Sequence, residues 1–245
     1  MDKLNLDIII PLKVDSVDRI NNLDIVINYL KNNLNCNIII SEQDNKPKLK
    51  NRYDCAYVFT EVDEFFNKTK GINMGVKHSN AKVIAIYDAD VIVSKSQLIK
   101  AYQLIDNSRY DMLYPYDGRF LDVPKYYHDK INELDFISVD EFTLFNSNSV
   151  GGVVLFDRDV FVAGGGGNEN FKGLGYDDNE IFERFVKLDY KYARIEGVLY
   201  HLNHVRTETA YDNNPYVNQN AEEYNRIASM NKKQLENEIK TWNFL

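Results

Sequence analysis

The chain has 245 residues, enough for one large α/β domain or two small ones. Its formal net charge of −8 argues against nucleic acid as a partner. The two cysteines, Cys36 and Cys55, indicate neither a disulfide framework nor a zinc site, and they fit a reducing compartment. No signal peptide is visible, and no apolar run approaches the ~20 residues that span a bilayer. We therefore expect a cytoplasmic protein that is soluble or attached to membranes only peripherally.

The first 105 residues alternate strand-like and helix-like segments. Short apolar runs predict strands, and apolar residues at helical spacing predict the helices between them. The predicted strands are residues 6–11, 37–41, 55–59 and 83–86, and the predicted helices are residues 17–34, 66–79 and 94–105. Residues 42–50 are polar, contain Pro47 and are predicted as a loop. This alternation indicates a parallel sheet of the nucleotide-binding kind.

The pattern changes after residue 105. Strands are predicted at residues 111–116, 151–156 and 192–200, and helices at residues 158–164, 178–188 and from 221 to the C-terminus. Residues 117–140 are charged and predicted as irregular. The four glycines at 164–167 predict a mobile or sharply turning loop. Because no internal repeat and no linker is visible, the chain is predicted to form a single mixed α/β domain.

Asp88 and Asp90 form the most informative motif, Tyr87-Asp88-Ala89-Asp90-Val91, at the end of the predicted strand 83–86. Two carboxylates two residues apart point to the same side of a strand. The carboxyl end of a strand is where open α/β sheets bind their ligands. A hard divalent cation that carries a diphosphate needs oxygen ligands of this kind. Solvated loop carboxylates produce the same pattern, so the pair is not specific by itself.

Two further groups carry candidate chemistry. The glycine turn at 173–175 brings Asp177 and Asp178 to the start of a predicted helix, where acids either stabilise the helix dipole or serve as a general base. His201 and His204 follow a predicted strand three residues apart, and neutral imidazoles of this kind bind divalent metals. Each group alone is also compatible with a structural role.

Taken together and in order, these segments resemble the motifs of metal-dependent glycosyltransferases of the β-1,4-galactosyltransferase type and of bacterial capsule and chondroitin-type polymerase domains. The segments are residues 8–13, residues 66–75 with the pattern F-N-[RK]-x-K-x-x-N-x-G, residues 87–91, Gly151-Gly152-Val153, residues 173–180 and His204-Val205-Arg206. The resemblance implies a GT-A fold, with a Rossmann-like half and a mixed central sheet, over residues 1–245. Residues 1–105 would be the nucleotide-sugar-binding half, and residues 106–245 the acceptor half with the C-terminal helices.

The resemblance also implies a metal site. Asp90 and His204 would bind Mn²⁺ (or Mg²⁺), and Asp88 would assist the metal or hold the donor ribose. His201 and Arg206 would lie next to these ligands and hold them in place without binding the metal themselves.

Donor and acceptor residues follow from the same resemblance. Lys68 would face the donor phosphates. The nucleobase pocket would be bordered by Pro11, Lys13 and Asp44, and the donor sugar would approach the backbone of Gly151 and Gly152. Asp178 would deprotonate the acceptor hydroxyl, and Asp177, the competing candidate for this role, would orient the acceptor.

The expected function is inverting transfer of a sugar from a UDP-sugar to a hydroxyl of a glycan or lipid-linked saccharide, as in polysaccharide biosynthesis. Relatives of the retaining polypeptide N-acetylgalactosaminyltransferase type carry an amide where this chain has Asp178, which favours inversion. Ser149 replaces a bulky aromatic of galactose-specific relatives, which favours a UDP-N-acetylhexosamine donor. Leu174 stands where the family has tryptophan.

Three alternatives remain at this stage. They are a retaining transferase, a non-catalytic glycan-binding or nucleotide-binding protein of the same fold, and a nucleotidyltransferase. The last of these normally has a glycine-rich phosphate loop where this chain has Pro11-Leu12-Lys13.

Overall fold

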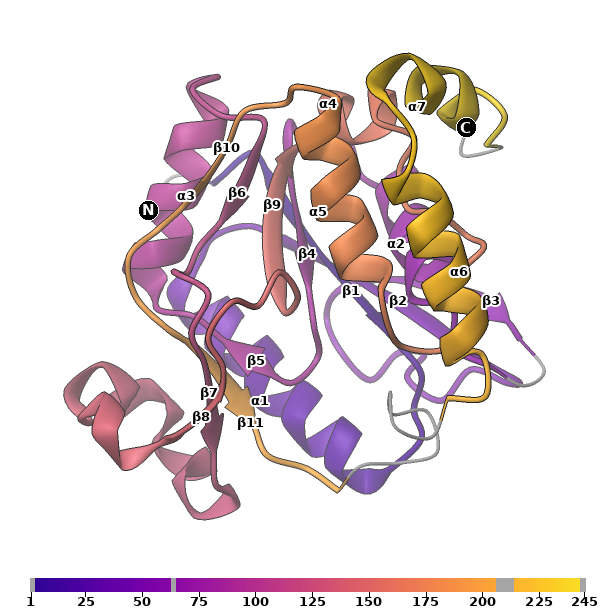
Figure 1. The fold of residues 1–245 in the computed structure, drawn as a ribbon. Coiled ribbons are helices and arrows are strands. Elements are labelled where there is room, and N and C mark those ends of the chain that lie inside the picture. The colour runs from indigo at the N-terminus through magenta and orange to yellow at the C-terminus, as the bar shows by residue number, and fades with distance from the viewer. Residues whose placement is uncertain (1–2, 63–64, 206–213, 243–245) are drawn as a thin grey trace.

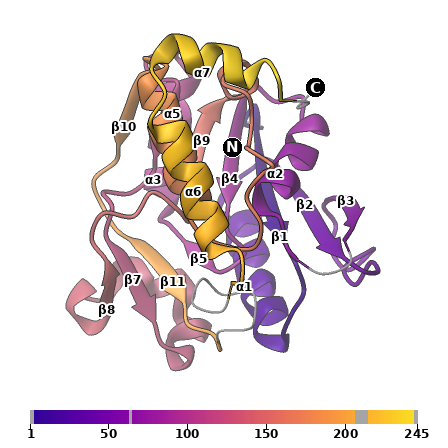
Figure 2. The same cartoon turned by 45° about the vertical axis from the view of Figure 1, so that its right-hand side comes forward.

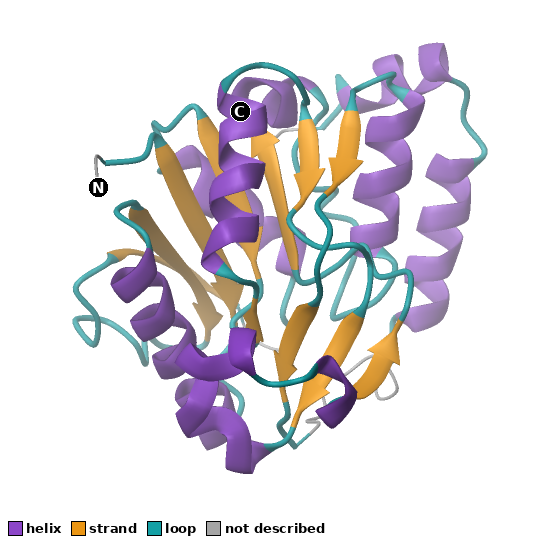
Figure 3. Ribbon diagram, turned by 90° about the vertical axis from the view of Figure 1, so that its left-hand side faces the viewer, coloured by secondary structure: helices purple, strands orange, loops and turns teal. Residues whose placement is uncertain are grey.

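The structure, a computed structural model, describes residues 3–62, 65–205 and 214–242 (Figure 1). Its central sheet has seven strands in the order β10-β6-β9-β4-β1-β2-β3. Helices lie on both faces of this sheet (Figure 3). Within the described residues, the structure contains no helix with the length and apolar character needed to cross a bilayer.

The first half of the chain builds the parallel part of the sheet. Its four neighbouring strands are β1 (Leu6–Leu12), β2 (Asn37–Asp44), β3 (Ala56–Glu61) and β4 (Val83–Tyr87), and its helices are α1 (Val17–Asn33), α2 (Lys68–Lys77) and α3 (Lys95–Asp106). All residues of β1 and β4 are buried, because a parallel strand covered on both faces needs a continuous apolar run. The strand ends beside Pro11 and Asp88 therefore meet at one edge of the sheet.

Later strands complete the mixed sheet. The antiparallel strand β9 (Val153–Asp157) pairs with β4, and β6 (Met112–Tyr114) and β10 (Tyr192–Arg194) follow it. The expectation of a mixed central sheet in one α/β domain is confirmed.

A second, four-stranded sheet lies next to the Asp88–Asp90 edge. Its order is β5-β11-β7-β8, with bounds β5 (Val91–Ile92), β11 (Leu199–Leu202), β7 (Phe120–Val123) and β8 (Thr143–Asn146). Two 3₁₀ segments, η1 (Lys125–Phe136) and η2 (Val139–Glu141), connect β7 to β8. Because β5 begins directly after Asp90, this sheet brings residues from the second half of the chain to the metal motif (Figure 2).

Three local predictions were wrong. Residues 192–200 form two strands in different sheets, because the chain turns at Gly197, whose φ is +121°. Strand β2 extends into the predicted loop as far as Asp44. Buried Glu42 accepts hydrogen bonds from the amides of Lys48 and Leu49. The irregular stretch 117–140 contains β7.

The C-terminal part forms a helical layer over the sheet. It contains α4 (Arg158–Ala163), α5 (Asp177–Lys187), α6 (Val217–Ala228) and α7 (Lys232–Ile239), with α5 and α6 side by side (Figure 1, Figure 2). The glycine run 164–167 is a buried, sharply turning loop. Fully buried Arg184 donates hydrogen bonds to the carbonyls of Gly164 and Gly166 and pairs with Glu180 at 2.6 Å.

We expect Arg184→Ala to lower the free energy of unfolding by about 3–5 kcal/mol, because Glu180 would remain buried without its partner. The matched control is Lys187→Ala, which removes a half-exposed pair with Glu183 at the same spacing on the same helix and should cost about 0–1 kcal/mol. Urea unfolding curves measure both changes. Equal losses of unfolding free energy in the two variants would show that the buried Arg184 pair contributes no more than the half-exposed pair.

Candidate active site

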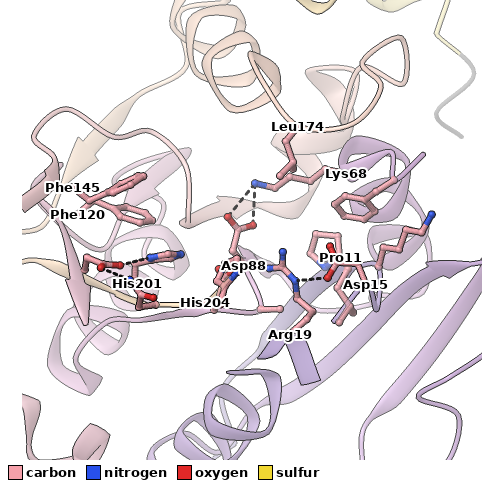
Figure 4. A pocket seen from close by; sticks show the side chains of 17 residues that line it. Pro11, Asp15, Arg19, Lys68, Asp88, Phe120, Phe145, Leu174, His201 and His204 are labelled. Atoms are coloured by element: carbon pink, nitrogen blue, oxygen red, sulfur yellow. Dashed lines mark hydrogen bonds and ion pairs between the residues drawn. The ribbon is translucent and has the colours of Figure 1, made fainter. Parts of the chain in front are cut away.

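A cleft of about 370 Å³ opens at the carboxyl ends of β1 and β4, where the second sheet meets the first. Side chains from both halves of the chain line it (Figure 4). Its lining residues are Pro11, Leu12, Lys13, Asp15, Arg19, Phe66, Lys68, Asp88, Ala89, Asp90, Phe120, Asp122, Phe145, Leu174, His201, Asn203 and His204. Seven residues predicted from the sequence are therefore brought together at this cleft.

The backbone around the aspartate pair is fixed by both sheets. The amide of Asp88 donates to the carbonyl of Gly152 at 2.8 Å, and the carbonyl of Asp90 accepts from the amide of Leu202 at 2.8 Å. Gly152 has φ +81°, and a Cβ there would lie 2.7 Å from the Leu199 side chain. A glycine is thus required at this position for β9 and β11 to approach the metal motif closely.

Asp90, His201 and His204 form a compact cluster, in which one ligand atom of each lies within 4.8 Å of the others. The Nδ1 atom of His201 lies 3.0 Å from Oδ1 of Asp122, and Nδ1 of His204 lies 3.0 Å from the Val205 carbonyl. Since a carbonyl only accepts and a carboxylate orients an imidazole in the same way, Nε2 of each ring would be the ligand atom. Nε2 of His204 lies 3.1 Å from Oδ2 of Asp90, a contact that a bound cation would replace. The residues present fit a divalent cation.

Charge in this cluster is balanced by neighbouring cations. Burial alone would raise the pKa of Asp90, but Arg19 and the histidines hold it below its ordinary value. The hydrogen bond that His204 donates to Asp90 raises the pKa of His204. Asp90 is therefore an anionic carboxylate at neutral pH, as a candidate metal ligand must be.

Lys68 joins the aspartate pair to the glycine turn. Its side chain is 6% exposed, and its Nζ lies 2.9 Å from Oδ1 of Asp88 and 3.1 Å from Oδ1 of Asp178. Although burial lowers the pKa of a lysine, the surrounding carboxylates raise that of Lys68 well above its ordinary value. A permanent positive charge thus lies between these two acids.

Asp178 is held near the start of α5 by the glycine turn. Gly173, Gly175 and Tyr176 all have positive φ, and Asn214 of the segment before α6 donates to the carbonyls on both sides of Gly173. Burial raises the pKa of Asp178, Lys68 lowers it, and the neighbouring carboxylates raise it again, to about 7. A carboxyl group with this pKa suits a general base at neutral pH.

Gly151 and Asp177 are two neighbours of Asp178 with different contacts. A Cβ at Gly151 would lie 2.6 Å from Oδ2 of Asp178, so the glycine leaves room for the carboxylate. Asp177 is 4% exposed, and its Oδ1 accepts from the amide of Gly175 at 3.2 Å. Asp177 therefore lies behind the turn, whereas Asp178 faces Lys68.

Of the other residues predicted to bind the donor, only some line the cleft. Pro11 and Lys13 line the cleft, but buried Asp44 pairs with Lys48 at 2.6 Å and does not line it. Arg206 lies outside the described residues.

Sequence reasoning missed Arg19, Asp122 and the aromatic pair Phe120 and Phe145. Phe145 is half exposed and stacks on His201 at 5.9 Å between ring centroids. Only the strand-like alternation of residues 120–123 could have drawn attention to Phe120 and Asp122.

Comparison of the sequence with known families gives two matches. The family described as "Glycosyl transferase family 2" matches residues 8–162, and the family described as "N-terminal domain of galactosyltransferase" matches residues 136–208. The chain belongs to glycosyl transferase family 2. The expected class, a glycosyltransferase with a GT-A fold, is confirmed. A search of curated proteins gave no match.

Solved structures share the fold at low identity. The catalytic domain of Drosophila β1,4-galactosyltransferase 7 with xylobiose is 19% identical, with a TM-score of 0.50 over 77% of this chain and 63% of that one. A mutant of it, complexed with manganese, UDP-Gal and xylobiose, is 18% identical with the same TM-score and coverage. A mannosyltransferase from Pyrobaculum calidifontis with GDP-Man and Mn²⁺ is 16% identical, with a TM-score of 0.53 over 86% of this chain and 60% of that one. The chain thus spans under two thirds of the length of these relatives.

Proposed function

We propose that this chain is an inverting, Mn²⁺-dependent glycosyltransferase that transfers a sugar from a UDP-sugar to a carbohydrate hydroxyl. The observation that carries this proposal is the contact of Lys68 with Asp88 on one side and Asp178 on the other. This contact sets a candidate base beside the candidate donor site. Solved relatives in complex with manganese and a nucleotide sugar support the choice of cofactor and donor class.

Asp90, His201 and His204 would hold the cation. The mixed nitrogen and oxygen donor set suits manganese better than magnesium, which prefers oxygen ligands alone. When bound, the cation supplies positive charge that stabilises the departing diphosphate. His201 is included here as a ligand because its Nδ1 is already anchored by Asp122.

Side chains of this chain carry out the other steps of the proposed reaction. Lys68 lies where its ammonium can stabilise negative charge that develops on the leaving group. Asp178 takes the proton from the acceptor hydroxyl as that oxygen attacks the anomeric carbon. Attack from the face opposite the leaving group inverts the anomeric configuration, and NMR of the product distinguishes this outcome from retention.

The acceptor side is proposed to lie between Leu174 and the aromatic pair Phe120 and Phe145, which face the cleft opposite Pro11 (Figure 4). Their rings are 5.8 Å apart, and an aromatic face suits the C–H groups of a sugar. A glycan or a lipid-linked saccharide could supply such a sugar.

For the metal, Asp90→Ala should abolish the dependence of UDP binding on Mn²⁺, and His204→Ala should weaken it, because each removes a proposed ligand. Titration calorimetry of UDP and of GDP, with and without Mn²⁺, measures this. The control is His128→Ala, which removes a histidine outside the cleft. If UDP binds equally well without the metal, the metal assignment is wrong.

For the base, Asp178→Asn should lower kcat roughly 10²–10⁴-fold and leave UDP affinity nearly unchanged. Because the base must be ionised and its pKa is about 7, the wild-type kcat should fall about tenfold for each pH unit below about 7. This acidic limb should disappear in the variant. Asp177→Asn should mainly raise the acceptor KM. A loss of kcat in Asp177→Asn alone would move the assignment to Asp177.

For the donor, we propose a UDP-N-acetylhexosamine, because small Ser149 precedes Val150-Gly151 and its hydroxyl accepts from the Gly151 amide at 3.2 Å. Ser149→Phe should shift the preference among UDP-GalNAc, UDP-GlcNAc, UDP-Gal and UDP-Glc towards the unsubstituted hexoses. Ser147→Phe places the same ring at an exposed position and is the control. A wild-type preference for an unsubstituted hexose would refute this choice of donor.

A further inference from the structure

Arg19 has a position that the proposed reaction leaves unexplained. It extends from α1 into the cleft (Figure 4), where its guanidinium lies between Asp15 and Asp90. The Nη1 atom bonds to Oδ2 of Asp90, and Nε lies 3.7 Å from Oδ1 of Asp15. Its side chain is only 17% exposed, so this cation is built into the site.

Asp90 cannot easily serve Arg19 and a metal ion at once. The same atom, Oδ2, also lies 3.1 Å from Nε2 of His204. Arg19 therefore bonds to the carboxylate at the point where Asp90 and His204 would share a cation. The guanidinium and a divalent cation are like charges, and they would repel each other strongly at this distance in a partly buried site. A cation bound to Oδ2 beside His204 would therefore displace Arg19 from this atom.

A nucleoside diphosphate offers Arg19 a new partner. The guanidinium is planar, always charged and presents paired donors that match two phosphate oxygens. The cleft already contains the carboxylates of Asp15, Asp88 and Asp90 around this side chain. A donor that enters with the cation adds the negative charge that lets Arg19 turn away from Asp90.

We propose that Arg19 is an exchangeable counter-ion of the donor site: it neutralises Asp90 before the donor arrives and bonds to the diphosphate when metal and donor bind together. This inference rests on the proposed function, since it takes Asp90 as a metal ligand. Its consequence is that Mn²⁺ alone binds weakly, and that Mn²⁺ and UDP each strengthen the binding of the other.

The test measures Mn²⁺ binding to the whole chain by electron paramagnetic resonance, without and with saturating UDP. Arg19→Gln should bind Mn²⁺ alone about tenfold or more tightly than the wild type, because the competing cation is gone. In the same variant, UDP should increase Mn²⁺ affinity by a smaller factor than in the wild type. Arg19→Lys retains the charge without the planar donors and should give intermediate values.

The matched control is Lys125→Gln. Lys125 pairs at 2.6 Å with Asp18, which lies on α1 as Arg19 does, and Lys125 does not line the cleft. Its loss therefore removes one positive charge without removing a partner of Asp90. This variant should bind Mn²⁺ and UDP like the wild type. Equal melting temperatures of the variants confirm that each one is folded.

The outcomes separate this inference from the proposed function. If Asp90→Ala abolishes Mn²⁺ binding but Arg19→Gln leaves it unchanged, the counter-ion role is refuted and the metal site stands. If neither the wild type nor Arg19→Gln binds Mn²⁺, both proposals fail. If UDP binds without Mn²⁺ and Arg19→Gln abolishes that binding, Arg19 replaces the metal and the exchange is refuted.

Discussion

The buried ammonium of Lys68 is the interaction on which the geometry of the site depends. It lies between Asp88, which follows β4, and Asp178, which lies near the start of α5. A lysine that is 6% exposed is tolerated only with close anionic partners, because an unpaired charge would be strongly destabilising there. This single contact therefore links the parallel strands of the first half of the chain to the helical layer and sets the two acids on opposite sides of one charge.

The same principle extends across the cleft. Arg19 lies between Asp15 and Asp90, as Lys68 lies between Asp88 and Asp178, so that each cation is shared by two carboxylates. A charge held as firmly as that of Lys68 needs little reorganisation when a charged ligand enters, which is the property that electrostatic catalysis requires. Arg19, by contrast, is the cation that we propose to exchange Asp90 for the diphosphate. The low pKa of Asp90 and the raised pKa of Asp178 follow from their different neighbours. These different pKa values suit the two roles that we propose, Asp90 as an anionic metal ligand and Asp178 as a base.

Several contacts outside the cleft hold these charges in place. The Gly173 amide donates to the Phe66 carbonyl at the start of α2, and Asn214 and Asn220 donate to carbonyls of the glycine turn. Arg184 and Asn73 fix the buried run 164–167 behind α5. The turn that carries Asp178 is thus braced from both sides, so the proposed base is positioned by rigid elements and not by a free loop.

The sequence by itself determined the parallel strands, the helices between them, and the catalytic class, because apolar periodicity and the motifs are local properties of the chain. It placed Asp88 and Asp90 at the carboxyl edge of the sheet, since the ends of parallel strands meet there. The place of Lys68 beside the donor was implied by the family resemblance alone. Tertiary structure alone decided the second sheet, which separates β10 from β11 at Gly197 and brings Asp122 behind His201. It also decided the position of Arg19, whose sequence context is that of an ordinary helix residue. Contacts across 71 residues, such as Arg19 to Asp90, leave no periodic signal, because they depend on how two elements pack and not on either element alone.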